Sequence, residues 1–197
     1  GVLPRKTLLK RKAAGKKVEF QLVAANVDVA FIVQSLNENF NLRRLERYLV
    51  MVNEAGITPA ILLSKCDLVS TEKVELIKQE IIAIAPDVKI TEFSSLNDQN
   101  ISVLIDSLKL GLTYCLLGSS GVGKTTLLNR ILGSDEFKTQ SVSKIESKGR
   151  HTTTSRQLVL LDGGAIILDT PGMRELGGIA VDDGLDETFA DILGFFV

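Results

Sequence analysis

The 197-residue sequence has few of the sulfur and imidazole side chains that bind zinc or form disulfides: two cysteines and one histidine. Cys66 and Cys115 lie far apart, without the close spacing of paired metal ligands, so a zinc site built from this chain alone is not expected. No apolar run approaches the roughly 20 residues that cross a bilayer, and no secretory signal begins the chain. These absences favour a protein of the reducing cytoplasm that makes no contact with a membrane, and we expect a monomer.

The chain also has no large excess of either charge, because 23 basic and 24 acidic residues give a net charge of −1. Any contact with a polyanion must therefore be local. Residues 1–17 carry seven basic side chains and no acidic one. This segment is either a tail that contacts RNA or a solvated linker from a missing upstream domain, and composition favours neither.

What the sequence does contain is an alternation of apolar strands and amphipathic helices, followed by a polar stretch over 134–155. A hairpin with the turn Asp162-Gly163-Gly164 comes next. The alternation predicts an α/β fold in three layers, with a doubly wound, mostly parallel sheet whose ligands bind beyond the carboxyl ends of the strands. Strands are expected over 27–34, 59–63, 88–93, 112–117, 157–161 and 165–168, and helices over 42–55 (capped by Asn41), 71–85, 100–108 (capped by Asn100) and 126–132.

The most informative stretch is Gly118-Ser-Ser-Gly-Val-Gly-Lys-Thr125, which fits the phosphate-binding P-loop pattern between a strand and a helix. Its glycines let successive backbone N–H groups face one anion, and the helix N-terminus adds partial positive charge. Lys124 would reach the β- and γ-phosphates, and the Thr125 hydroxyl would bind Mg²⁺. The nucleotide-binding residues expected here are Gly118, Ser119, Ser120, Gly121, Val122, Gly123, Lys124, Thr125 and Thr126.

Three further signals accompany the P-loop: Ser64-Lys-Cys-Asp67 with Ser94-Ser95, the Thr152–Thr154 run, and Asp169-Thr-Pro-Gly172. Together the four resemble the five motifs of the GTPase superfamily, in the order fourth, fifth, first, second, third (G4-G5-G1-G2-G3). This order corresponds to a circular permutation, which is tolerated when the old termini lie close together at the surface.

With Gly149-Arg-His-Thr-Thr-Thr154 and the lead-in Ala25-Asn-Val-Asp28, the permuted order resembles the RsgA (YjeQ) family of small-ribosomal-subunit assembly GTPases. In that family an OB-fold domain precedes the GTPase domain and a zinc-binding domain follows it. The resemblance therefore implies a basic linker over 1–20 from a missing OB-type domain and a permuted GTPase domain over 21–197. Zinc is expected only in the missing C-terminal domain.

The resemblance also implies how a guanine base would bind. Asp67 would accept hydrogen bonds from guanine N1 and N2, which adenine cannot offer, and Lys65 would cover the base with its methylene stem. Ser94 and Ser95 would support the base through backbone N–H groups. Ser64 stands where the family usually has asparagine, and its shorter side chain would weaken a contact to the base or to the P-loop.

Around the γ-phosphate, Asp169 resembles the acidic residue that holds Mg²⁺ through water, and the Gly172 N–H the donor to the phosphate. Thr153 or Thr154 would complete the Mg²⁺ shell, with Thr154 preferred. Met173 replaces the water-orienting glutamine of other GTPases, which predicts slow intrinsic hydrolysis. His151 is the candidate catalytic group, and the alternative is a solvated histidine in a loop.

The sequence therefore predicts an enzyme that binds GTP or GDP with Mg²⁺ and hydrolyses GTP during maturation of the small ribosomal subunit. By the resemblance, that subunit and its rRNA are the partners and the activator. One alternative is a nucleotide-gated RNA-binding module with negligible hydrolysis, which Met173 and the basic amino-terminal segment leave open. Another is an ATP-using P-loop enzyme, which the serine at position 64 does not exclude.

Overall fold

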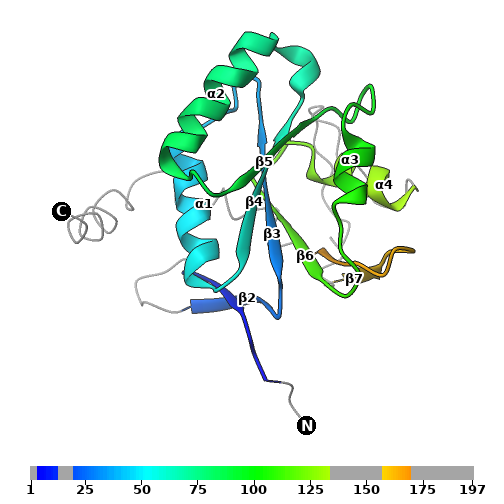
Figure 1. Cartoon of the computed structure of the whole chain (residues 1–197). Helices are drawn as coiled ribbons and strands as arrows, with labels where there is room; N and C mark the ends of the chain where they lie inside the picture. Colours follow the sequence, from blue (N-terminus) through cyan, green and yellow to red (C-terminus); the bar gives the residue numbers. More distant parts are fainter. Residues whose placement is uncertain (1–3, 13–19, 134–156, 170–197) are drawn as a thin grey trace, which may run out of the picture.

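The computed structural model describes residues 4–12, 20–133 and 157–169. Among these, six strands form one sheet in the order β5-β4-β3-β6-β8-β7, and two further strands form a separate antiparallel hairpin (Figure 1). All neighbours in the large sheet are parallel except β7 and β8. The predicted mostly parallel α/β architecture is confirmed.

The elements that the sequence predicted lie close to their predicted positions, whereas β1, β2 and η1 were not predicted. The strands are β1 (Leu8–Lys12), β2 (Phe20–Ala25), β3 (Val29–Ser35), β4 (Thr58–Ser64), β5 (Lys89–Phe93), β6 (Thr113–Leu117), β7 (Gln157–Leu160) and β8 (Ile166–Asp169). The helices are α1 (Leu42–Glu54), the short 3-10 helix η1 (Cys66–Leu68), α2 (Thr71–Ile84), α3 (Ile101–Asp106) and α4 (Lys124–Leu132). The polar stretch over 134–155 lies outside the described residues.

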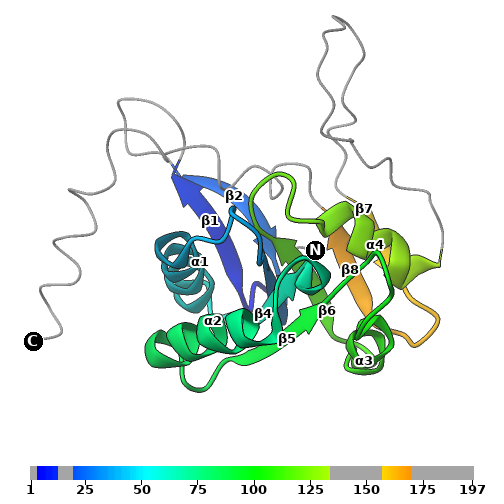
Figure 2. The same cartoon turned by 90° about the horizontal axis from the view of Figure 1, so that it is seen from above.

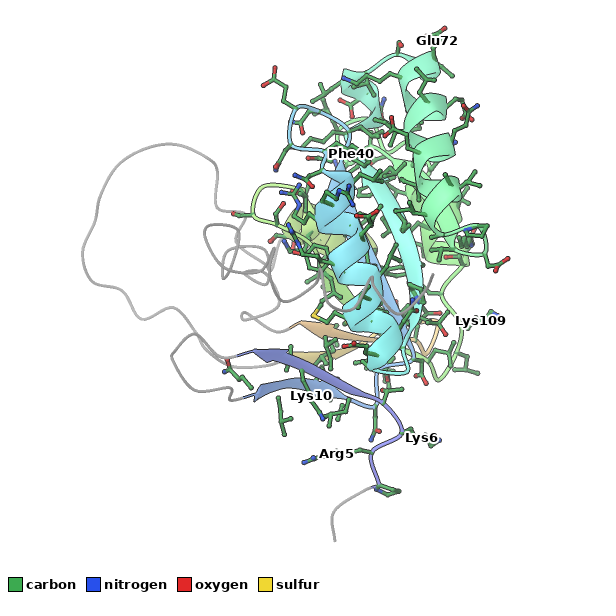
Figure 3. All side chains as sticks on the ribbon, turned by 90° about the vertical axis from the view of Figure 1, so that its left-hand side faces the viewer. Arg5, Lys6, Lys10, Phe40, Glu72 and Lys109 are labelled. Atoms are coloured by element: carbon green, nitrogen blue, oxygen red, sulfur yellow. The ribbon has the colours of Figure 1, made fainter. Side chains whose placement is uncertain are left out.

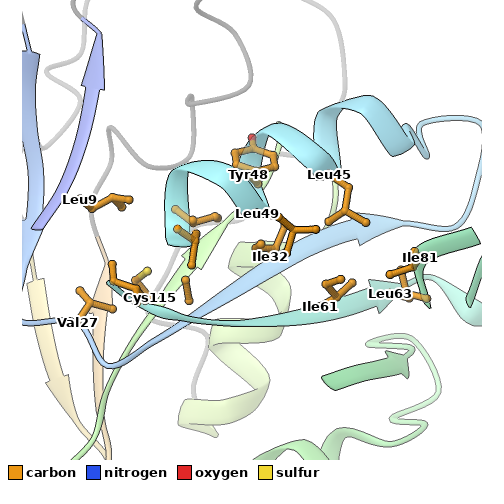
Figure 4. Packing of buried hydrophobic residues seen from close by; sticks show 14 of the residues in the cluster. Leu9, Val27, Ile32, Leu45, Tyr48, Leu49, Ile61, Leu63, Ile81 and Cys115 are labelled. Carbon is orange, nitrogen blue, oxygen red and sulfur yellow. The ribbon is translucent and has the colours of Figure 1, made fainter. Parts of the chain in front are cut away.

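Each face of the sheet carries its own core. Side chains from α1 and α2 pack with Ile32, Leu63 and Leu117 on one face, and side chains from α3 and α4 pack with Val33 and Leu116 on the other. Figure 2 shows the two pairs of helices on opposite sides of the sheet, and Figure 4 shows the packing under α1. Neighbouring residues of one strand serve opposite cores because successive side chains alternate between the faces of a sheet.

The two predicted helix caps have different outcomes. The Asn41 side chain accepts a hydrogen bond from the Arg44 backbone N–H at 2.9 Å, so the predicted cap of α1 is confirmed. Asn100 is the N-cap residue of α3, as predicted, but its side chain makes no capping bond: the residue is left-handed (φ 58°) and its amide donates instead to the Glu92 carbonyl oxygen at 3.0 Å. The helix that follows ends at Asp106, earlier than predicted. A tertiary contact to β5 here replaces the local capping bond.

Part of the basic amino-terminal segment is held against the domain. Leu9 of β1 is fully buried, and the Leu8 N–H donates to the Ala55 carbonyl oxygen at the end of α1. The Thr7 hydroxyl donates to the Val27 carbonyl oxygen at 2.8 Å. Figure 3 shows that the nearby basic residues Arg5, Lys6 and Lys10 lie at the opposite end of the molecule from Phe40 and Glu72.

Asp28 aligns the starts of the three central strands. Its carboxylate accepts a hydrogen bond from the Thr113 N–H at 2.7 Å, and its carbonyl oxygen accepts one from the Thr58 N–H at 3.0 Å. Thr113 begins β6 and Thr58 begins β4, while Asp28 immediately precedes β3. The short segment from Ala25 to Asp28 thereby fixes β4, β3 and β6 relative to one another.

Candidate functional site

The predicted P-loop connects β6 to α4 and crosses the carboxyl end of the sheet. Gly118 has a φ of 146°, and a Cβ atom built on it would lie 2.4 Å from the Val33 carbonyl oxygen. Only glycine fits this close approach to β3. Gly121 (φ 76°) and Gly123 (φ 94°) are also left-handed, although both face open space. Backbone geometry therefore requires the glycines of the motif.

The polar groups of the loop face inward. The Lys124 ammonium donates to the carbonyl oxygens of Gly118 (2.7 Å) and Ser119 (2.6 Å) and is largely buried. The Ser119 hydroxyl is buried and has no hydrogen-bond partner within the described part of the chain. Gly123 is the N-cap of α4, so no side chain there satisfies the N–H groups of the first turn. These donors fit a bound phosphate chain.

Thr125 lies in the first turn of α4 and Asp169 is the last residue of β8. β8 pairs with β6, the strand that leads into the P-loop, so the two residues lie on neighbouring segments. A hydroxyl and a carboxylate supply the oxygen ligands that Mg²⁺ prefers. The described residues hold no cluster of three metal-ligating side chains of the His, Cys, Asp or Glu type.

The predicted guanine motif begins at Ser64, the last residue of β4. The Ser64 hydroxyl donates to the Val122 carbonyl oxygen of the P-loop at 2.7 Å, and lies 3.3 Å from the Gln34 carbonyl oxygen. The sequence suggested that the shorter serine would weaken a contact to the base or to the P-loop. The hydroxyl does reach the P-loop backbone, and the weakened contact to the base stays a prediction.

Past Ser64 the chain turns sharply. Lys65 is left-handed (φ 60°), which is uncommon for a non-glycine residue and makes the sharp turn possible. η1 follows, with Asp67 exposed and Cys66 buried. Burial raises the pKa of the Cys66 thiol, and the Asp67 and Glu92 carboxylates raise it further, so this thiol stays protonated at neutral pH. Cys66 is therefore a packing residue of the motif.

The second predicted base-supporting segment follows β5. Ser94 is fully buried, and its hydroxyl accepts a hydrogen bond from the Leu96 N–H at 3.1 Å, which shapes the turn. Arg130, near the end of α4, donates to the Ser95 carbonyl oxygen at 3.1 Å and lies 3.3 Å from the Asp98 carboxylate. The P-loop helix thereby holds this segment. Sequence inspection missed Arg130, because no local pattern reveals a contact between residues 35 positions apart.

The P-loop, the Ser64–Asp67 motif, the Ser94-Ser95 turn and the end of β8 all lie at the carboxyl ends of parallel strands. The structure therefore brings them together at one end of the sheet. Four other predicted site residues, His151, Thr153, Thr154 and Gly172, lie outside the described residues, as does Met173. The side chain of Asp169 is likewise not described. No helix of the described residues is both long and apolar enough to cross a membrane.

The comparison with known families decides the classification, because residues 2–179 match the model of the RsgA GTPase family. The chain belongs to the RsgA GTPase family. The recognition made from the order of the motifs is thus confirmed.

Among curated relatives of the RsgA GTPase family, the small ribosomal subunit biogenesis GTPase RsgA 2 of Vibrio parahaemolyticus is 47% identical over 97% of this chain. The small ribosomal subunit biogenesis GTPase RsgA of Methanosarcina acetivorans is 44% identical over 98% of it. These alignments cover 53% and 52% of the relatives, so the chain spans about half the length of the curated relatives it matches.

Two solved structures of similar fold support the architecture. YjeQ from Thermotoga maritima matches with a TM-score of 0.63 and 26% identity, over 87% of this chain and 53% of that one. YloQ, described as a circularly permuted GTPase, matches with a TM-score of 0.55 and 21% identity, over 86% of this chain and 57% of that one. The predicted permutation of the RsgA GTPase fold is confirmed.

Proposed function

We propose that this chain binds GTP and GDP with Mg²⁺ and hydrolyses GTP as a switch in the maturation of the small ribosomal subunit. The observation that carries the proposal is the hydrogen bond from Ser64 to Val122, which joins the end of the predicted guanine motif to the phosphate loop. One nucleotide can therefore contact both. The ribosomal role rests on the names of the relatives, small ribosomal subunit biogenesis GTPases.

In this proposal the phosphates bind across the P-loop. Lys124 would exchange its carbonyl partners for the β- and γ-phosphate oxygens, while the Ser119 hydroxyl and the N–H groups of the first turn of α4 would donate to the phosphate chain. Mg²⁺ would be held by Thr125, Asp169 and Thr154, and would neutralise charge on the phosphates. The loop geometry is already formed, so binding requires little rearrangement of the backbone.

Base selection would fall to Asp67, whose carboxylate can accept two hydrogen bonds from guanine. Adenine offers no matching pair of donors and would leave the carboxylate unpaired. Lys65 and the turn at Ser94-Ser95 would enclose the base. Gly172 would contact the γ-phosphate, and His151 would serve the attacking water, because Met173 cannot orient it.

Competition between nucleotides tests guanine binding. GTP should displace a fluorescent GDP analogue at concentrations at least 100-fold lower than ATP does, and Asp67→Asn should abolish most of this preference. As a matched control, Asp87→Asn changes an exposed carboxylate in the loop between α2 and β5 and should leave the preference intact. Equal affinities for GTP and ATP in the unchanged chain would contradict the proposal and favour the ATP-using alternative.

A second candidate function is a nucleotide-gated RNA-binding module with negligible hydrolysis. The observation that favours it is the placement of Arg5, Lys6 and Lys10 together at the end of the molecule remote from the P-loop edge (Figure 3). Single-turnover GTP hydrolysis, measured with and without small ribosomal subunits, separates the two. Stimulation by the subunits supports the GTPase switch, and no stimulation supports the RNA-binding module.

A further inference from the structure

Two buried polar atoms without a hydrogen-bond partner lie where β3 runs beside the P-loop. They are Gln34 Nε2 and the Ser119 hydroxyl; the other such atoms of the described residues are Arg44 Nε and the Tyr48 hydroxyl. Gln34 is completely buried, and the proposed function gives it no role. Buried polar groups are nearly always satisfied, because leaving them without partners destabilises the fold. An unused donor and an unused hydroxyl on neighbouring segments indicate a contact that nucleotide binding could complete.

The pairing of β3 with β6 places Gln34 beside the P-loop. The two strands are parallel neighbours, and Ile32 of β3 pairs with Leu117 of β6 (Figure 1). Gln34 and Ser119 each follow this pair by two residues. The P-loop still touches β3 between the two positions, because a Cβ atom built on Gly118 would lie 2.4 Å from a carbonyl oxygen of β3.

A second contact ties the same residue to the P-loop. The Ser64 hydroxyl lies 2.7 Å from the Val122 carbonyl oxygen and 3.3 Å from the Gln34 carbonyl oxygen. A single oxygen atom therefore contacts both Gln34 and the phosphate loop. The backbone of Gln34 is thus fixed next to the loop from two sides.

Arg44 on α1 determines how the Gln34 amide is oriented. Arg44 Nη2 lies 3.2 Å from Gln34 Oε1, and because a guanidinium can only donate, the amide oxygen must face it. The same Nη2 atom donates to the Asn39 carbonyl oxygen, which holds the guanidinium in place. The amide nitrogen of Gln34 is therefore the end that remains available to another acceptor.

We propose that Gln34 is a positioning residue for phosphate binding and acts through the Ser119 hydroxyl. This inference rests on the proposed binding of GTP and GDP at the P-loop. A hydroxyl donates one hydrogen bond and accepts two, so Ser119 can accept from Gln34 Nε2 while it donates to a phosphate oxygen. The hydrogen bonds then run in one direction, from the Arg44 guanidinium through the Gln34 amide and the Ser119 hydroxyl to the phosphate.

The contact is expected to form when phosphates bind. Without nucleotide, the Lys124 ammonium donates to the Ser119 carbonyl oxygen at 2.6 Å. When Lys124 exchanges this oxygen for phosphate oxygens, Ser119 is free to adjust toward Gln34. A chain of hydrogen bonds that begins at a cation polarises each member, so the Ser119 hydroxyl becomes a stronger donor to the phosphates.

A double-mutant cycle on nucleotide affinity tests the proposal, with Gln34→Met and Ser119→Ala in the full chain. Methionine keeps the length of the glutamine side chain but cannot donate a hydrogen bond. Each variant should weaken GDP binding about tenfold, and the double variant also about tenfold, where independent effects would give about a hundredfold. Affinity for guanosine, which carries no phosphate, should stay unchanged in all three.

The side-chain amide signals of Gln34 in nitrogen-15 NMR spectra give a readout that does not depend on affinity. These signals should shift when GDP binds to the unchanged chain, and most of the shift should disappear in Ser119→Ala saturated with GDP. The matched controls are Gln79→Met on α2 and Ser102→Ala on α3, which change exposed residues of the same types. Both should leave the affinity for GDP unchanged.

Three results would overturn the role of Gln34: losses that multiply in the cycle, equal losses for GDP and guanosine, and an amide shift that persists in Ser119→Ala. The NMR measurement decides the matter if Gln34→Met does not fold. If the unchanged chain binds GDP, any of these results leaves the proposal of GTP binding intact. If the unchanged chain binds no GDP, the proposed function fails, and the role of Gln34 fails with it.

Discussion

The Ser64 hydroxyl donates a hydrogen bond to the Val122 carbonyl oxygen at 2.7 Å, across 58 residues of sequence. Ser64 ends β4 and is 2% exposed, while Val122 lies in the middle of the P-loop and is completely buried. The contact fixes the phosphate loop relative to the turn that carries Asp67. A single hydroxyl thus links the two halves of the proposed nucleotide site.

Ser64→Ala should weaken binding of both GDP and GTP about fivefold, because one buried hydrogen bond of roughly 1 kcal/mol is lost. Ser64→Thr keeps the hydroxyl and serves as the control, with a smaller effect expected. Isothermal titration calorimetry measures both. Unchanged affinity in Ser64→Ala would show that the P-loop holds its shape without this contact.

Gly118→Ala should destabilise the fold strongly, because its Cβ atom would overlap the Val33 carbonyl oxygen at 2.4 Å. Gly133→Ala is the matched control: Gly133 is also left-handed (φ 62°) but faces open space. The control should lose only about 1 kcal/mol of unfolding free energy from backbone strain. Urea denaturation of the two variants compares them, and equal losses would contradict the steric explanation.

Arg130→Ala should weaken GDP binding about threefold and reduce the preference for GTP over ATP, because the turn at Ser95 loses its anchor on α4. The effect is modest since the Arg130 side chain is 46% exposed. Asp98→Asn removes the charge of the ion pair but leaves the hydrogen bond to Ser95. If the anchor is that hydrogen bond, Asp98→Asn retains most of the selectivity that Arg130→Ala loses.

Glu92→Gln should change how stability depends on pH. Lys78 lies 2.9 Å from the carboxylates of both Glu92 and Glu75. Burial acts to raise the pKa of Glu92, but the hydrogen bond and charge of Lys78 outweigh it and hold that pKa below its usual value of 4.5. The ion pair therefore stabilises the fold above pH 4.5, and this contribution is lost as the pH falls through the lowered pKa.

At pH 7 Glu92→Gln should lower the free energy of unfolding by up to about 1 kcal/mol, and the difference from the unchanged chain should shrink below pH 4.5. Glu80→Gln, an exposed position on α2, the helix that carries Lys78, should leave the profile unaltered. Thermal unfolding followed by circular dichroism between pH 3 and pH 8 measures the profiles. A difference that stays constant with pH would mean that Glu92 acts through packing.

Local signals in the sequence predicted the P-loop and its flanking elements, because strand, glycine turn and helix lie within about twenty consecutive residues. The mostly parallel sheet followed from the alternation of strands and helices, but the order of its strands was not predicted. The position of the Asn100 cap was predicted correctly, but its capping bond is absent because its amide finds a partner on β5, which no local pattern encodes. Strand β1 was missed because its run of basic residues concealed Leu9, whose burial depends on contacts with the rest of the domain.

The functional contacts that sequence could not supply are those between distant segments. From the sequence, Ser64 was expected to make weaker contacts than the asparagine usual in the family. Only the position of the P-loop backbone shows that the Ser64 hydroxyl can reach the Val122 carbonyl oxygen. Arg130 and Gln34 carry no motif at all. The residues of the site could be recognised from their types and motifs. The hydrogen bonds between them could not, because these depend on distances that are set by the whole sheet.

Because the chain enters the sheet through Asp28, its first long strand, β3, is inserted between the strand that ends at Ser64 and the strand that opens the P-loop. The hairpin of β1 and β2 leads directly into β3. The amino-terminal hairpin is therefore joined to the strand that lies between the predicted base-binding and phosphate-binding segments, and a displacement of the hairpin is expected to act on both.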